Sequence, residues 1–197
     1  MVFELGTLGS GILLAAFAAS IARRLRSGLP SWLIPVGAFA GALVPIEGVP
    51  IAGYLHGLAS DLSVTTLVLV GCGLAARTVG LRFADRRDVF AVLAAVLAGA
   101  AFLYPMTLGL TRYDPYRLGY RSEGFLLVLA LLALAGWLFR YRLLPAVLCC
   151  AVVAFGLALG ESQNLWDYLI DPFLSLFAAV WIGLELRSSA LSPNLGK

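Results

Sequence analysis

Long apolar runs recur along the whole chain, separated by short stretches that are charged or rich in glycine and proline. None of the runs shows the polar face that a surface helix of a water-soluble domain needs. The runs lie at residues 5–22, 32–46, 62–76, 89–108, 125–139, 143–160 and 172–186. The pattern therefore predicts an all-α fold: a polytopic bundle of about seven transmembrane helices that forms one integral membrane domain over residues 1–197.

Two of the seven runs admit another interpretation. The run at 32–46 lies among four prolines, so it could form a kinked or re-entrant segment and leave six spanning helices. The run at 62–76 could begin near Ile51, which would place His56 and Asp61 in one long tilted helix instead of a loop. Several runs are also short, because fifteen residues rise only about 22 Å against a hydrocarbon core of about 30 Å.

The composition excludes several classes of protein. The 197 residues are 61% hydrophobic and 13% charged, whereas soluble domains carry roughly a quarter charged residues. Water is therefore not the main solvent. The basic residues form no stripe interleaved with aromatic residues, so nucleic acid is not an expected partner. The three cysteines lie inside apolar runs without CxxC spacing, which favours small buried side chains over disulfides or a thiolate metal cluster.

The distribution of basic residues predicts the orientation. With the N-terminus outside, the opposite side holds eleven of the 14 basic residues, namely Arg23, Arg24, Arg26, Arg77, Arg82, Arg86, Arg87, Arg140, Arg142, Arg187 and Lys197. The reverse orientation would conflict with the positive-inside bias. The first run is followed, not preceded, by arginines, which favours a retained helix over a cleaved signal peptide. We therefore expect a multi-pass protein of a bacterial inner or plasma membrane, with the C-terminus in the cytoplasm.

Acidic residues concentrate on the non-cytoplasmic side in this topology. That side holds eight of the 11 acids, namely Glu4, Glu47, Asp61, Asp114, Glu123, Glu161, Asp167 and Asp171. It also carries the single histidine and the longest polar connections, which are where binding residues are usually found. We expect three outer connections to form a shallow polar pocket in the cell envelope.

The first of these connections contains His56 and Asp61, which are candidate catalytic residues because an imidazole and a carboxylate can share a proton. Ser60 or Asp61 is equally well placed to cap the following helix. A zinc site would need carboxylates for its other ligands, whereas magnesium, manganese or calcium would suit oxygen ligands. The identity of any metal or cofactor stays open.

The second connection contains Arg112, Arg117 and Arg121, the three arginines that break the orientation bias. Forked guanidinium groups suit phosphate or carboxylate, so these are candidate substrate-binding residues. The alternative is that they pair with acids of neighbouring loops, beside a turn at Asp114–Pro115.

The third connection contributes Glu161, Trp166 and Asp167. If it is helical, Asp167 and Asp171 share a face and could hold a cation or exchange protons, so Asp167 is a candidate catalytic residue. Glu161 is a candidate substrate-binding residue, as is Trp166, which could cover a sugar or rest among headgroups. Asp171, followed by proline, is better explained as the cap of the last helix.

Glycine pairs at four-residue spacing, Gly37–Gly41, Gly53–Gly57 and Gly156–Gly160, predict places where helix backbones approach closely. No GxSxG, HExxH or Walker motif occurs, so whether the chain is an enzyme stays open. No run carries a charge at its centre, which disfavours a pump or ion-coupled transporter.

These features support three hypotheses. The leading one is a protein that binds or modifies a membrane lipid, or a lipid-linked phosphate or sugar, at the outer pocket. The alternative is a non-catalytic subunit that docks onto a membrane-protein partner, and the third is a minimal transporter.

Overall fold

The computed structural model describes residues 5–25, 28–59, 61–110, 113–120 and 122–191. Most of these residues are helical, which confirms the all-α prediction. In chain order the elements are α1 (Leu5–Arg24), α2 (Leu33–Ala42), β1 (Pro45–Ile46), β2 (Val49–Pro50), α3 (Ile51–Ala59), α4 (Val64–Thr78), α5 (Arg86–Pro105), η1 (Met106–Leu110), η2 (Pro115–Gly119), α6 (Glu123–Leu138), α7 (Leu143–Gly156), α8 (Leu165–Leu169) and α9 (Pro172–Leu191).

Every predicted apolar run contains one helix, but the helices differ in length. Among the described residues, two helical stretches are long and apolar enough to cross a membrane, Gly6–Arg24 and Arg86–Leu110. This gives weak support for a membrane location, and a count of seven spans stays a prediction. The helices α2, α4, α6 and α7 are apolar but shorter. With ten residues, α2 rises about 15 Å, half the hydrocarbon core, and the re-entrant interpretation stays a prediction.

The alternative of one long helix from Ile51 is wrong, because α3 ends at Ala59 and residues 61–63, which precede α4, are not helical. The predicted cap of α4 is wrong as well: its N-cap is Ser63, whose hydroxyl accepts a hydrogen bond from the Thr66 amide at 3.2 Å. Ser63 takes this role because its backbone is extended and its buried side chain is held by Asp171. His56 lies in α3, and Asp61 lies between the two helices.

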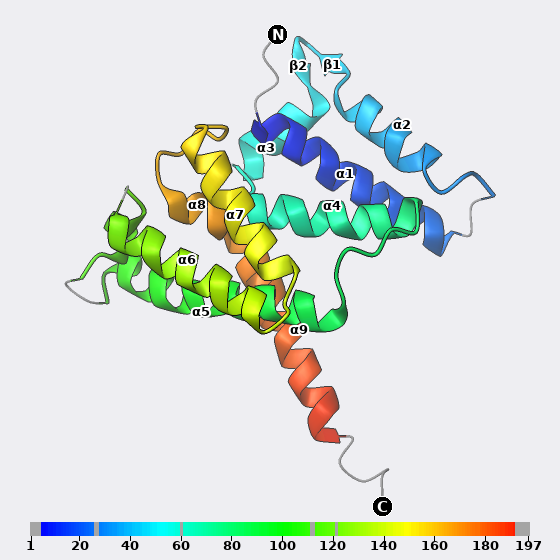
Figure 1. Ribbon diagram of the computed structural model, residues 1–197. Coiled ribbons are helices and arrows are strands. Elements are labelled where there is room, and N and C mark those ends of the chain that lie inside the picture. Colours follow the sequence, from blue (N-terminus) through cyan, green and yellow to red (C-terminus); the bar gives the residue numbers. More distant parts are fainter. Residues whose placement is uncertain (1–4, 26–27, 60, 111–112, 121, 192–197) are drawn as a thin grey trace, which may run out of the picture.

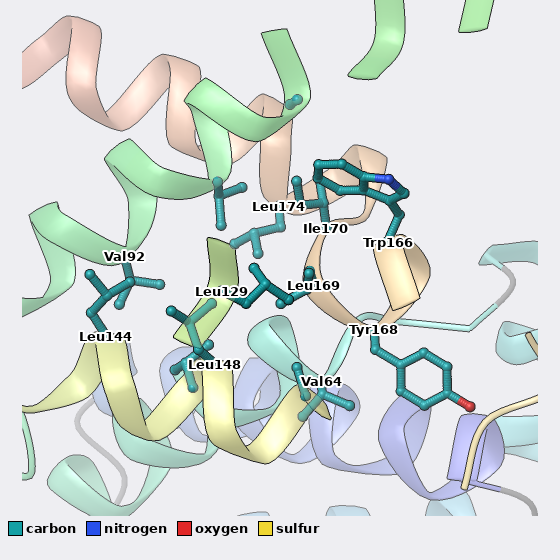
Figure 2. Packing of buried hydrophobic residues seen from close by; sticks show 14 of the residues in the cluster. Val64, Val92, Leu129, Leu144, Leu148, Trp166, Tyr168, Leu169, Ile170 and Leu174 are labelled. Atoms are coloured by element: carbon teal, nitrogen blue, oxygen red, sulfur yellow. The ribbon is translucent and has the colours of Figure 1, made fainter. Parts of the chain in front are cut away.

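The helices form two groups, α1 to α4 and α5 to α9 (Figure 1). Helix α1 packs against α2, α3 and α4, whereas α5 packs against α7 and α9, and α6 against α7. Contacts of α4 with α7 and α8 join the two groups. The main core lies between α5, α7 and the segment from α8 into α9. In Figure 2, Leu144 and Leu148 of α7 lie close to Val92 of α5, with Leu169 and Ile170 beside them.

Helix ends gather at two opposite ends of this assembly. The C-terminal ends of α1 and α4 lie together at one end, on the right of Figure 1, where Arg23 and Arg77 line the same cavity. Arg86 forms an ion pair with Glu185 near the same end. The C-terminal end of α7, α8 and the N-terminal ends of α1 and α4 lie at the other end, on the left.

The predicted glycine contacts are mostly wrong. A Cβ atom added at Gly37, Gly41, Gly57 or Gly156 would meet no atom within 4 Å. Close approach occurs instead at isolated glycines, because a neighbouring side chain, not a second glycine, fills the space. In α1, Gly9 faces Leu67 of α4 at 3.0 Å.

Gly99 of α5 provides a test of this packing. A Cβ atom there would lie 2.5 Å from Ile170 Cδ1 and 3.6 Å from the Trp166 ring. We expect Gly99→Val to lower the free energy of unfolding by about 1–3 kcal/mol through overpacking. The matched variant Gly156→Val, also helical but facing open space, should cost less than about 1 kcal/mol. Denaturation in detergent measures both, and equal losses would contradict this account.

Candidate functional site

Asp167 joins two of the three outer connections. Its Oδ2 atom accepts hydrogen bonds from the hydroxyls of Tyr116, at 2.7 Å, and Ser162, at 2.5 Å. Tyr116 belongs to η2 in the second connection, and Ser162 belongs to the third. The premise that Asp167 and Asp171 share one helical face is wrong, because α8 ends at Leu169 and Ile170 is extended.

Local sequence explains why η2 and α8 meet. The Asp114 side chain accepts a hydrogen bond from the Tyr116 amide at 3.0 Å, and Pro115 begins η2, as the predicted turn requires. The buried Asn164 side chain caps α8 through the Trp166 amide and donates to the Tyr116 carbonyl at 2.9 Å. A Cβ atom at Gly119 would overlap Asn164, so glycine permits this close approach.

Tyr116 is held in its protonated form. Burial raises its pKa well above the usual range, and the hydrogen bond to Asp167 raises it further. The phenol therefore donates to the carboxylate throughout the neutral pH range. The Asp167 carboxylate is in this way oriented by groups from two connections, which fixes its position at the protein surface.

Trp166 lies in the core and not on the surface. Its side chain is buried, its indole nitrogen donates to the Pro115 carbonyl at 3.0 Å, and its ring packs on Phe125 with centroids 4.4 Å apart. No exposed ring face remains for a sugar or a headgroup. The role of Trp166 is therefore to dock α8 against α6 and η2.

Beside Asp167 opens a cavity of about 540 Å³. Its wall combines two carboxylates and three tyrosines with apolar side chains: Leu103, Tyr104, Met106, Thr107, Tyr113, Asp114, Tyr116, Asp167, Ile170 and Pro172. No basic side chain of the described residues lines it. The carboxylates can accept hydrogen bonds from hydroxyl groups, and the apolar side chains can contact hydrocarbon.

A second polar cluster forms around His56 at the same end. The His56 Nε2 atom lies 3.3 Å from Glu161 Oε1, and its Nδ1 atom lies 3.6 Å from Asp61 Oδ1. The Glu161 amide donates to Asp61 Oδ2 at 3.1 Å, which ties the first connection to the third. Gly6 at the start of α1 covers the imidazole, because any Cβ atom there would overlap His56 and Asp61.

The two clusters adjoin without merging. Asp61 and Asp167 both line a narrow cavity of about 20 Å³, which is room for about one water molecule. His56 and Glu161 line neither this cavity nor the larger one. The predicted single pocket is thus two neighbouring sites, a histidine–carboxylate cluster and an aspartate–tyrosine cavity.

Of the three predicted arginines, the one that the structure describes does not line the cavity. Arg117 is exposed on η2, and it does not line the cavity. Arg112 and Arg121 lie outside the described residues. Among the residues that the structure describes, no group of three His, Cys, Asp or Glu side chains is arranged to hold a metal ion.

The prediction from sequence missed the network around Asp171. The carboxylate is buried, and its Oδ2 atom accepts hydrogen bonds from the Ser63 amide and hydroxyl and from the Thr66 hydroxyl. Its Oδ1 atom accepts from the Leu174 amide at 2.8 Å, which confirms the predicted capping of α9. The only signal in the sequence was the polar content of residues 60–66, which does not identify a partner more than 100 residues away.

Comparison with known proteins gives no family for this chain. No protein-family model, no curated protein and no solved structure matches it. The functional conclusion rests on the fold and the two clusters.

Proposed function

We propose that this chain is a multi-pass membrane protein that binds the hydroxylated headgroup of a lipid, or a lipid-linked sugar, in the aspartate–tyrosine cavity on the non-cytoplasmic face. The observation that carries the proposal is the composition of that cavity. Carboxylate and phenol groups line it together with apolar side chains.

Membrane embedding is supported by the apolar surface of the helices. In α6, the side chains of Leu126, Leu127 and Val128 are 36%, 60% and 58% exposed. These successive positions point in different directions around the helix, and α6 carries no charge after Glu123. A helix that is apolar all round and uncovered by protein is suited to contact with lipid.

The proposed orientation predicts on which side of the membrane a tag at each terminus lies. Because the arginine-rich end lies in the cytoplasm, an N-terminal tag should be accessible to protease on the outer surface of intact cells, and a C-terminal tag should be protected. The reverse pattern of protection would reject the orientation and place the cavity in the cytoplasm.

The cavity suits hydroxyl-rich ligands. The carboxylates of Asp114 and Asp167 are acceptors for sugar or glycerol hydroxyls, and a tyrosine ring can lie against the apolar face of a sugar. Leu103, Met106 and Ile170 offer contact to the first carbons of a lipid chain. In this proposal the exposed Arg117 binds a lipid phosphate, and the same role stays a prediction for Arg112 and Arg121, which lie outside the described residues.

The histidine–carboxylate cluster supplies the chemistry if the bound lipid is modified. His56 with Asp61 or Glu161 can take up and return one proton at the imidazole. Asp61 contacts the small cavity that it shares with Asp167, so a proton can pass between the sites through one bridging water.

Purification of the full chain in a mild detergent tests the proposal. Mass spectrometry of an organic extract should show a glycolipid or polyol lipid retained at about one molecule per chain. Retention at fixed stoichiometry of another membrane protein, without lipid, would favour the subunit hypothesis. Uptake of a soluble solute by vesicles containing the purified chain, without lipid retention, would favour the transporter hypothesis.

A further inference from the structure

At the opposite, arginine-rich end, α1, α2 and α4 enclose two cavities that play no part in the proposed outer site. One cavity, of about 350 Å³, is lined by Arg23 of α1, Arg77 of α4 and Ser31 before α2, with apolar residues around them. The other, of about 420 Å³, is bounded by apolar side chains, among them Ile12, Trp32 and Phe39, with Thr78 as its polar member.

The two cavities adjoin. The Ser31 hydroxyl donates to the Thr78 carbonyl at 2.7 Å, and Ser31 lines the first cavity while Thr78 lines the second. Along α1, the positions that line them are 12, 15, 19, 22 and 23, which follow a spacing of three or four residues and so share one helical face. A basic recess and an apolar groove therefore meet between the same three segments.

The charges in the basic recess are not neutralised by the described residues. No described carboxylate lies within ion-pair distance of Arg23 or Arg77, and no acid lines the recess. The Arg77 side chain turns back along α4, with one guanidinium nitrogen 3.6 Å from the position of a Cβ atom on Gly73.

We propose that this recess and groove form a binding site for an anionic glycerophospholipid of the cytoplasmic leaflet. The phosphate binds between Arg23 and Arg77, and one acyl chain lies in the apolar groove. Basic pockets between membrane helices on the cytoplasmic side suit such headgroups, and a guanidinium pair can bind several phosphate oxygens. The inference uses the proposed orientation but not the outer cavity, so the outer site can fail while this one holds.

Titration of the delipidated full chain with phosphatidylglycerol, followed by native mass spectrometry, tests the site. Each arginine near a membrane surface contributes about fivefold to affinity for an anionic lipid, so Arg23→Gln/Arg77→Gln should weaken binding by about 30-fold. The control Arg24→Gln/Arg187→Gln removes two exposed charges that line neither cavity, and it should change binding less than threefold. Equal losses in the two double variants would show diffuse attraction and overturn the proposal.

Two further lipid titrations test whether the basic recess binds the headgroup and whether the apolar groove binds the acyl chain. Phosphatidylcholine of the same chain length should bind at least tenfold more weakly, as should a phosphatidylglycerol with six-carbon chains, which fills less of the groove. Equal affinity for phosphatidylcholine would overturn the headgroup assignment, and equal affinity for the short-chain lipid would overturn the groove assignment. Displacement of the lipid by inorganic phosphate at millimolar concentration would identify a soluble-anion site instead.

Discussion

Asp171→Ala is expected to lower the free energy of unfolding by about 3–5 kcal/mol, the largest effect of any single substitution considered for this chain. The substitution removes the acceptor for the Ser63 amide and hydroxyl, the Thr66 hydroxyl and the Leu174 amide. These donors are buried and would be left without a charged partner. Because they come from α4 and α9, the loss would also loosen the contact between the two groups of helices.

Denaturation of the purified variants in detergent measures this effect. Asp171→Asn retains the shape and the cap of α9 but places an amide group opposite the Ser63 amide, so it should cost less, about 1–2 kcal/mol. Glu123→Ala is the matched control, because Glu123 is an exposed acid at the start of α6. A loss for Asp171→Ala no larger than for this control would show that the buried network does not join the helices.

Asp167→Asn is expected to weaken binding of the headgroup ligand by about ten- to hundredfold. A hydrogen bond to a charged acceptor contributes about 1.5–3 kcal/mol, and asparagine offers one neutral acceptor in place of the carboxylate. The fold should persist with a loss of about 1 kcal/mol or less, since the amide oxygen can still accept from Tyr116 or Ser162. Ligand affinity by native mass spectrometry, measured beside denaturation, separates the two effects.

Substitutions of two other acidic residues test whether this effect is specific to the cavity. Glu123→Gln changes the same charge at the same end without lining the cavity, so affinity should stay within about twofold. Asp61→Asn alters the histidine–carboxylate cluster, so it should leave binding intact and reduce only a turnover that needs proton transfer. Unchanged affinity in Asp167→Asn would reject the cavity as the ligand site.

Side chains that link distant segments explain why the site was only partly predictable. Asp61, Asp167 and Glu161 were identified because acids outside apolar runs are conspicuous in a chain with so few charges. Their partners were not identified, because the contacts of His56 with Glu161 and of Tyr116 with Asp167 join residues 105 and 51 positions apart. Trp166 illustrates the opposite case, since an aromatic residue in a polar connection looks exposed in the sequence, yet its ring is buried against Phe125.

The sequence alone determined the helices and their charge asymmetry. Apolar runs between polar breaks specify where helices form, because backbone groups in an apolar setting must bond within their own segment. The positions of the arginines in the sequence likewise predicted which helix ends are basic. Only the tertiary structure decided what the buried polar groups do. A carboxylate such as Asp171 must find donors wherever the packing of helices brings them, and that packing depends on the shapes of side chains far apart in the chain.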